Sequence, residues 1–274
     1  MRLIDLYQTL RAHFGPLHGP DAHSPWWPLF GADAHFEIIV GAVLVQQTRW
    51  ETVEAAVRRL LDASRLAPPA MAAAAPEELA ALIRPAAFHT QKAAGLIAIA
   101  RHICARHGGD TAAMLTMPTP ELRAELLGLP RIGPETCDVI MLYAGGHPVF
   151  VVDEYTRRLF DRLGSQASGA GSRGPEQMSF WRKSSYEAVR LVIEADLTTP
   201  TPESRLLTSI YADFHAQINE ACVRYCLSRP RCDGPPARRV YSAQAGRESY
   251  LASDEGCPLR GVCAWYQQGD KLTG

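Results

Sequence analysis

The stretch LLGLPRIGPETCDVIMLYAGGHPVFVVDEYTRRLFDRLG, residues 126–164, contains two helical segments separated by a tight turn. The first segment is the last part of a helix-forming run at 121–129. The turn is PRIGP at 130–134, and the second helical segment extends from Glu135 to about Tyr143. A glycine turn between two helices leaves backbone N–H groups pointing outward, where they can bind a phosphate. The same pattern is also typical of an ordinary helical hairpin inside a bundle.

An apolar run at 149–152 leads directly to Asp153, which is followed by EYTRRLF. A carboxylate that comes directly after a buried run can lie at the partly desolvated edge of a cleft. There it can stabilise positive charge that develops on a sugar, or activate a water molecule. Asp153 also has the residue type and the position expected for the N-cap of the following helix. The two roles are compatible.

The remainder of the chain predicts helices and few strands. Apolar residues recur at helical spacing, as at Phe36, Ile39 and Val43. Alanine-rich stretches favour helix, and proline or glycine interrupts the chain at short intervals. These patterns predict an all-α fold of many short helices, and 274 residues give room for two lobes. We expect a flexible loop at 165–176 and an inserted surface loop at 233–256.

The formal net charge of the chain is −1, so a face that binds nucleic acid would have to be a local basic patch balanced by acids elsewhere. The opening residues, MRLIDLYQTLRAHFG, lack the continuous apolar region of a secretory signal. No stretch approaches the ~18 apolar residues of a membrane span. We therefore expect a cytoplasmic protein with no membrane partner, whose seven cysteines are metal ligands or core thiols.

Four cysteines near the C-terminus form two pairs of equal spacing, Cys226 with Cys232 and Cys257 with Cys263. Such pairs among polar and basic residues favour metal binding, by a four-iron cluster or by zinc, over buried free thiols. The long interval between the pairs is consistent with a surface insertion, because lengthening a loop costs little closure entropy. Cys222 lies one helical turn before Cys226 and is an alternative ligand.

Four motifs in order along the chain resemble the endonuclease III superfamily of helix-hairpin-helix DNA glycosylases. LPRIGPETCDVI with VVDEYTRR resembles the hairpin and the aspartate of that family, and FEIIVGAVLVQQTRWETV resembles its first core helix and glutamine turn. IRPAAFHTQKAAGL resembles a later helix start, and RPRC with GCPLRGVC resembles the flanks of the family's iron–sulfur loop. With the cysteine tail, the resemblance covers most of residues 26–263.

The resemblance implies an all-α, two-lobed helix-hairpin-helix DNA glycosylase fold. One lobe would be a helical barrel at 36–147 that contains the hairpin. The other would combine 1–35 with 148–274 and hold a C-terminal iron–sulfur loop, in which the two cysteine pairs bind a 4Fe–4S cluster. The partner would be double-stranded DNA containing a damaged base, bound by a monomer in the nucleoid.

The resemblance also assigns roles to individual residues. Asp153 would drive release of the damaged base as the catalytic carboxylate. Gln46 and Gln47 would wedge into the duplex where the base flips out. The backbone of the hairpin turn would contact DNA phosphates without reading the sequence. The turn residues with this role would be Arg131, Ile132 and Gly133.

Glu135 is an informative departure from the family pattern. Members that also cleave the DNA backbone carry a lysine at this position, and its amine attacks the sugar as a Schiff-base nucleophile. A carboxylate cannot form a Schiff base, so we expect hydrolysis of the N-glycosidic bond with little or no AP lyase activity. Arg131 replaces the first hairpin glycine. Two roles are equally compatible with the sequence: an added contact with a DNA phosphate, or a neutral residue of the turn.

The damaged base is expected to be alkylated. The sequence IGPET, the pair Trp26 and Trp27 before a proline, and Trp50 after QQT resemble the 3-methyladenine glycosylase branch of the superfamily. Electron-poor or cationic purines stack favourably on tryptophan, and Glu135 could contact such a base. The tryptophans would also fit the core or a lobe interface, and QQT also resembles the mismatch-adenine glycosylases.

Two other functions are compatible with the sequence. One is a bifunctional glycosylase and AP lyase, similar to endonuclease III, that acts on oxidised pyrimidines and uses another amine such as Lys92. The other is a non-catalytic protein that binds damaged DNA. An asparagine or an apolar residue at position 153 would have favoured this second function. The aspartate that is present does not favour it.

Overall fold

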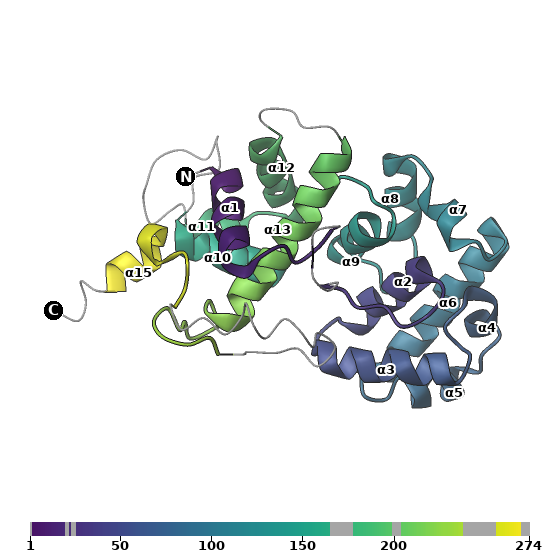
Figure 1. The fold of residues 1–274 in the computed structure, drawn as a ribbon. Coiled ribbons are helices and arrows are strands. Elements are labelled where there is room, and N and C mark those ends of the chain that lie inside the picture. Colours follow the sequence, from purple (N-terminus) through teal and green to yellow (C-terminus); the bar gives the residue numbers. More distant parts are fainter. Residues whose placement is uncertain are drawn as a thin grey trace. The chain divides into compact units, whose positions relative to one another are not determined.

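The computed structural model describes residues 2–19, 22, 26–164, 178–198, 204–237 and 256–269. Within these ranges the chain forms helices joined by loops and no strand, which confirms the predicted all-α fold (Figure 1). The loop expected at 165–176 lies outside the described residues, as does most of the insertion expected at 233–256. No helix in the described ranges is long and apolar enough to cross a membrane.

The helices are named as in Figure 1. They are α1 (Leu3–Phe14), α2 (Ala34–Leu44), α3 (Trp50–Asp62), α4 (Pro68–Ala72), α5 (Pro76–Leu82), α6 (His89–His107), α7 (Thr111–Leu115), α8 (Thr119–Leu127), α9 (Pro134–Val139), the π-helical η1 (Ile140–Ala144), α10 (Glu154–Leu163), α11 (Met178–Lys183), α12 (Tyr186–Leu197), α13 (Ser204–Arg224), the 3-10 helix η2 (Arg260–Val262) and α15 (Ala264–Gly269).

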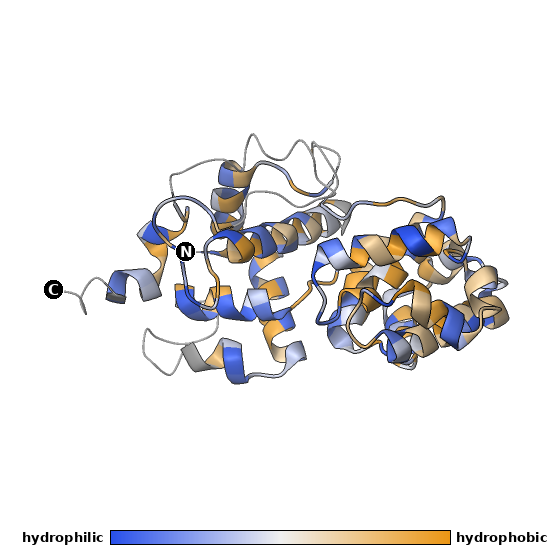
Figure 2. Ribbon diagram, turned by 90° about the horizontal axis from the view of Figure 1, so that it is seen from below, coloured by the Kyte–Doolittle hydropathy of each residue, from blue (hydrophilic) through white to orange (hydrophobic). Residues whose placement is uncertain are grey.

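Contacts between residues divide the chain into two compact units. The middle unit consists of Pro28–His147. The terminal unit combines Met1–Trp27 with the described residues from Pro148 onward. In both units most helices carry hydrophilic residues on one side and hydrophobic residues on the other, as Figure 2 shows. This distribution is expected for helices that are buried along one face.

In the middle unit, α2 is the central helix. Its sequence AHFEIIVGAVL is apolar on nearly every side, and Phe36, Ile39 and Val43 are fully buried. A helix that is hydrophobic all round belongs inside a core. Helices α3, α6, α7, α9 and η1 all contact α2. This packing fixes the C-terminal end of α2, from which the predicted glutamine turn leaves.

In the terminal unit, the long helix α13 is the axis, and α1 and α10 pack against it (Figure 1). Aromatic side chains fill the space between these elements: the ring of Phe214 on α13 lies 6.3 Å from that of Phe160 and 5.8 Å from that of Phe150. The ring of Phe160 lies 5.0 Å from that of Trp181. Each such pair adds about 0.5–1.5 kcal/mol beyond the burial of its area.

Candidate functional site

The helix-hairpin-helix predicted from the sequence lies in the middle unit. Helix α8 ends at Leu127, α9 begins at Pro134, and the two helices pack against each other. Gly133 is the extended N-cap residue of α9, and proline is favoured at the first position of a helix, where no N–H group is needed. Among the hydrogen bonds of the described chain, none uses the Gly133 N–H group. It is therefore available to a ligand.

The residues beside Gly133 lie in different environments. The side chain of Ile132 is buried and anchors the turn in the core. Glu135 is exposed on the first turn of α9. A carboxylate there is stabilised by the positive end of the helix dipole.

Arg131 adopts a left-handed backbone conformation, with φ of +66°. This conformation costs roughly 1–2 kcal/mol for a residue other than glycine. Its carbonyl accepts a hydrogen bond from Gln46 Nε2 (2.8 Å), and its Nη2 donates to Gln46 Oε1 (3.1 Å). The side chain also crosses α6 at Gly95, where an added Cβ would lie 2.6 Å from Arg131 Cγ. Arg131 thus links the hairpin to α2 and α6.

The two predicted wedge residues are placed differently. Gln46 Nε2 donates to the carbonyl of Arg131 and to Thr136 Oγ1 (3.0 Å), so its amide joins the end of α2 to the hairpin. Gln47 is exposed and has a left-handed φ of +54°. Of the pair, Gln47 therefore has the side chain that can reach into a duplex.

Lys92 on α6 is completely buried. Its ammonium group donates to the carbonyl oxygens of Leu44 (2.8 Å) and Gln46 (2.7 Å) and to Thr48 Oγ1 (3.0 Å). Burial, and to a smaller extent the charge of Arg131, lower the pKa of Lys92 to about 8. These contacts occupy all three hydrogens of the amine, so they argue against the nucleophilic role that the lyase alternative gives to Lys92.

Asp153 in the terminal unit is the N-cap residue of α10. Its Oδ1 accepts hydrogen bonds from Thr156 N (2.7 Å) and Thr156 Oγ1 (2.8 Å). Its Oδ2 accepts one from Asn219 Nδ2 (3.0 Å) and lies 3.5 Å from His215 Nε2. The side chain remains 14% exposed, so the carboxylate is partly desolvated and can still be reached.

The surroundings of Asp153 keep its carboxyl group ionised. Burial by itself raises the pKa of Asp153, but the hydrogen bond and charge of His215 and the hydrogen bonds from Thr156 outweigh this effect. The net pKa lies below the usual range for an aspartate. An anion held by fixed donors is suited to stabilise positive charge that develops next to it.

Trp26 contacts His215, the histidine whose Nε2 lies 3.5 Å from Asp153 Oδ2. Its ring meets the ring of His215 edge to face, with centroids 5.7 Å apart and an interplanar angle of 82°. Trp27 is mostly buried, and its ring lies 6.3 Å from that of Trp26. Trp50 belongs to the middle unit, where it is the first residue of α3. Of the predicted pocket tryptophans, Trp26 is the one whose ring contacts His215, a neighbour of Asp153.

The segment that carries Trp26 is held by buried Asp213 on α13. Asp213 Oδ1 accepts hydrogen bonds from the backbone N–H groups of Leu17 (2.8 Å) and His18 (2.9 Å). The Leu17 carbonyl in turn accepts a hydrogen bond from Trp26 N over 3.1 Å. Asp213 therefore positions the tryptophan over His215.

Asp213, His215 and Asn219 were not predicted from the sequence. They lie on one helix, 60 to 66 positions after Asp153. Their sequence signal is a set of polar residues at helical spacing in a helix whose other residues are mostly apolar. That signal indicates a line of polar side chains inside the fold, although it does not identify the residues that these side chains contact.

The four predicted metal ligands, Cys226, Cys232, Cys257 and Cys263, line one cavity of the terminal unit. Cys222 is not among its lining residues, and its thiol donates to the carbonyl of Tyr155 (3.5 Å). Among the described residues, no three of the cysteine sulfurs lie within 4.8 Å of one another. The four thiols therefore surround one common space.

The charges around this cavity also favour a bound cation. Burial raises the pKa of Cys232 to about 11 and that of Cys257 to about 12, and the neighbouring thiols add to both shifts. Arg162 on α10 donates from Nη1 to Cys226 Sγ (3.2 Å) and to the Leu227 carbonyl (2.5 Å). Arg162 and Arg260 both line the cavity, and two arginines cannot compensate four thiolates, so ionising all of them requires additional positive charge within the cavity.

Comparison with known proteins agrees with this geometry. Residues 40–179 match the family described as HhH-GPD superfamily base excision DNA repair protein. The chain is 32% identical over 237 residues to the Methanocaldococcus jannaschii protein named "Putative DNA repair glycosylase MJ1434", an alignment that covers 86% of this chain and 94% of that protein.

Two solved structures share the fold. Endonuclease III in a non-covalent complex with DNA has a TM-score of 0.66 and 19% identity, and the match covers 98% of this chain and 97% of the other. The H. pylori 3-methyladenine DNA glycosylase MagIII bound to 1,N6-ethenoadenine has a TM-score of 0.57 and 24% identity, covering 80% and 96%. Together with the family match, these similarities show that the chain belongs to the HhH-GPD superfamily of base excision DNA repair proteins, the superfamily of endonuclease III.

Proposed function

We propose that this protein removes a damaged, alkylated base from double-stranded DNA by hydrolysis of the N-glycosidic bond, with little or no AP lyase activity. The observation that carries the proposal is the environment of Asp153. Thr156, Asn219 and His215 hold its carboxylate as an oriented anion, and the ring of His215 also contacts that of Trp26. This arrangement suits a reaction in which the sugar becomes positively charged as the base leaves.

The middle unit would bind the DNA backbone. The Gly133 N–H group at the N-terminus of α9 is suited to bind a backbone phosphate. Gln47 would fill the space that the flipped base leaves. Gln46, Arg131 and the buried Ile132 would support the hairpin from inside.

Trp26 supports the assignment of the base class. Its segment is held in place by the Asp213 anchor, and its ring lies against that of His215. A fixed indole face would stack well on an electron-poor or cationic purine. Trp27 would pack against the ring of Trp26.

The proposed lack of lyase activity rests on two residues, Glu135 and Lys92. Glu135 occupies the place of the Schiff-base lysine, and a carboxylate cannot form an imine. Lys92, the other candidate amine, is buried and donates three hydrogen bonds to the glutamine turn. Water is then the nucleophile that completes the reaction, and Glu135 would contact the base or its water.

We also propose that Cys226, Cys232, Cys257 and Cys263 bind a 4Fe–4S cluster. The bound cluster would supply a positively charged core that crosslinks four thiolates and so stabilises the C-terminal segment. Arg162 would complement the charge of the thiolates through its contact with Cys226. Cys222 would remain a core thiol.

A panel of duplexes that each carry one lesion tests the proposed function. Alkylated purines, oxidised pyrimidines and mismatched adenine are incubated with the protein and analysed with and without alkali. The expected result is release of an alkylated base and strand breakage only after alkali. Tight binding of damaged duplexes without release of any base would instead support the non-catalytic alternative.

A further inference from the structure

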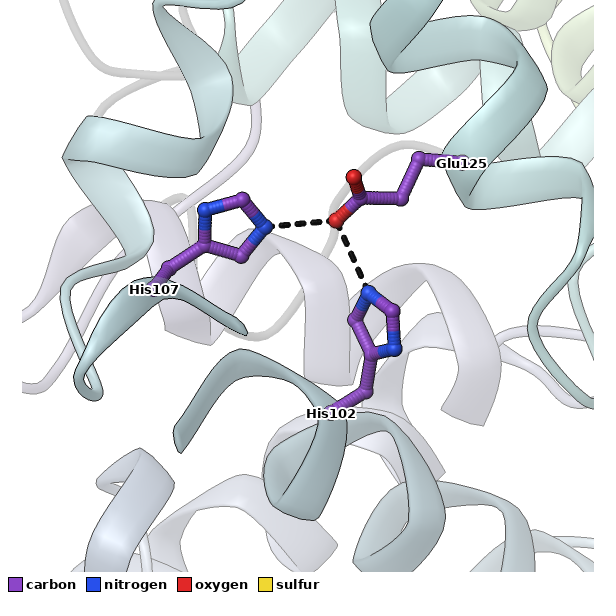
Figure 3. A group of neighbouring side chains, drawn as sticks. All are labelled: His102, His107 and Glu125. Atoms are coloured by element: carbon purple, nitrogen blue, oxygen red, sulfur yellow. Dashed lines mark hydrogen bonds and ion pairs between the residues drawn. The ribbon is translucent and has the colours of Figure 1, made fainter. Parts of the chain in front are cut away.

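Two histidines and a glutamate form a compact cluster in the middle unit that has no part in the site described above (Figure 3). His102 and His107 come from the C-terminal part of α6, and Glu125 comes from the last turn of α8. Both imidazole Nε2 atoms point at the same carboxylate oxygen: Glu125 Oε1 lies 2.8 Å from that of His102 and 2.5 Å from that of His107. Each of the three residues offers one ligand atom, and these atoms all lie within 4.8 Å of one another.

The surroundings of this cluster favour positive charge. His107 is the last residue of α6, and Glu125 lies two residues before the end of α8. The C-terminal end of a helix carries partial negative charge from its free carbonyl groups. Two such ends therefore meet at the cluster, together with the Glu125 carboxylate.

The cluster is also accessible. Its side chains are 25% (His102), 14% (His107) and 10% (Glu125) exposed, so an ion can enter from solvent without unfolding of the unit. Around a tetrahedral zinc ion with bonds of about 2.0–2.2 Å, ligand atoms lie about 3.3 Å apart. Each imidazole would have to move outward by less than ~1 Å to admit the ion.

We propose that His102, His107 and Glu125 bind a divalent transition-metal ion, with Zn²⁺ the best match. Two neutral imidazoles and one carboxylate are ligands that zinc accepts, and a water molecule would complete the coordination. Imidazole would also accept copper or nickel, whereas magnesium and calcium prefer oxygen ligands throughout. The site is separate from the cysteine cavity, which belongs to the terminal unit.

The ion would have a structural role in the middle unit. It would fasten the end of α6 to the end of α8, the helix that leads into the hairpin turn. Glu125 already anchors this end, because its carbonyl accepts the hydrogen bond of Gly128 N (3.1 Å). A metal at Glu125 would therefore limit movement of the first helix of the hairpin.

Zinc binding to the full-length protein, purified with its iron content intact, tests the proposal. Isothermal titration with Zn²⁺ compares the wild type with His102→Gln, His107→Gln and Glu125→Gln. The control is His89→Gln, which changes the same residue type on the same helix, about 20 Å away along its axis. One zinc ion should bind per chain to the wild type and the control. In the three cluster variants, the affinity for Zn²⁺ should fall by more than ~100-fold. Loss of a residue that only hydrogen-bonds to a metal ligand costs ~10–100-fold, and loss of a direct ligand should cost more.

X-ray absorption at the zinc edge identifies the ligand type, independently of the iron. Nitrogen and oxygen neighbours without sulfur are expected. Sulfur neighbours, or equal zinc affinity of the wild type and Glu125→Gln, would overturn the site. Thermal unfolding tests the role: excess Zn²⁺ should raise the melting temperature of the wild type and of His89→Gln, but not that of Glu125→Gln. The structural role is wrong if zinc leaves the melting temperature of the wild type unchanged.

Discussion

Asn219 Nδ2 donates a hydrogen bond to Asp153 Oδ2 over 3.0 Å, across 66 positions of sequence. Because Thr156 donates to the other carboxylate oxygen, donors from two helices fix the orientation of the group. His215 lies one helical turn before Asn219 on α13. Its Nε2 contacts Asn219, and its ring contacts that of Trp26. A single helix thus links the carboxylate to the aromatic ring proposed to hold the base.

Asp153→Asn is expected to lower the rate of base release by about 10²–10³-fold or more, because it removes the charge that stabilises the transition state. Asparagine is as good an N-cap as aspartate, so the fold and the affinity for duplex should persist. Single-turnover kinetics and a binding assay measure both effects. Glu154→Gln, which neutralises the adjacent exposed carboxylate, is the control and should keep its activity. Base release by Asp153→Asn at the control's rate contradicts the catalytic assignment.

His215→Gln is expected to shift the acid limb of the pH–rate profile to higher pH. His215 lowers the pKa of Asp153, so its loss raises the pH at which the carboxylate becomes protonated. Because the folded pKa lies below the unfolded value of about 3.9, ionised Asp153 stabilises the native state above that pH. This contribution is lost as the pH falls through the folded pKa. An acid limb that stays in place in His215→Gln would show that the histidine does not influence the reacting group.

The hairpin and Asp153 could be predicted from sequence because their signals are local. A glycine turn, a proline at the start of a helix and a carboxylate after an apolar run each depend on neighbouring residues. The family resemblance rests on the same local motifs. His215 and Asn219 act on Asp153 only because α10 packs against α13, and no short pattern encodes that packing.

Burial explains the other differences between expectation and structure. In sequence, Lys92 is an amine in a family motif and is a reasonable nucleophile. In the structure it caps the end of α2 with three hydrogen bonds, since nearby carbonyl groups need a donor. Cys222 lies near the end of α13 and Cys226 lies two residues beyond that helix, only four positions later, so spacing alone cannot separate them. Only the direction of each thiol, toward α10 or toward the cavity, distinguishes the two.

Gln46→Ala and Gln47→Ala are expected to have different effects. Gln46→Ala removes hydrogen bonds to Arg131 and Thr136, and each loss should lower the free energy of unfolding by about 0.5–1.5 kcal/mol. Gln47→Ala should change it by less than ~0.5 kcal/mol, as at other exposed positions, but should slow base release. Urea denaturation and single-turnover kinetics distinguish them. If Gln47→Ala releases the base at the wild-type rate, Gln47 is not the wedge.

The purified protein is expected to be yellow-brown and to contain about four irons per chain. Cys257→Ser should lose this iron and become less stable, because cluster binding is coupled to folding. Cys222→Ser is the matched control and should keep its iron, since Cys222 does not line the cavity. Elemental analysis and visible absorption give the result. Stoichiometric zinc at these cysteines, or equal iron loss in both variants, would refute the proposed ligand set.

The wild-type protein is expected to leave intact abasic sites that break only on treatment with alkali. Attack on the sugar to form an imine needs a neutral amine near the reacting carbon, and Glu135 supplies a carboxylate where lyases have a lysine. Borohydride, which reduces an imine to a stable amine, should therefore trap little or no covalent protein–DNA complex. Glu135→Gln serves as the control, because it also lacks an amine and should trap as little as the wild type. Efficient trapping by the wild type would refute the hydrolytic mechanism. Abolition of that trapping in Lys92→Gln would then identify Lys92 as the nucleophile, despite the three hydrogen bonds that hold it in the glutamine turn.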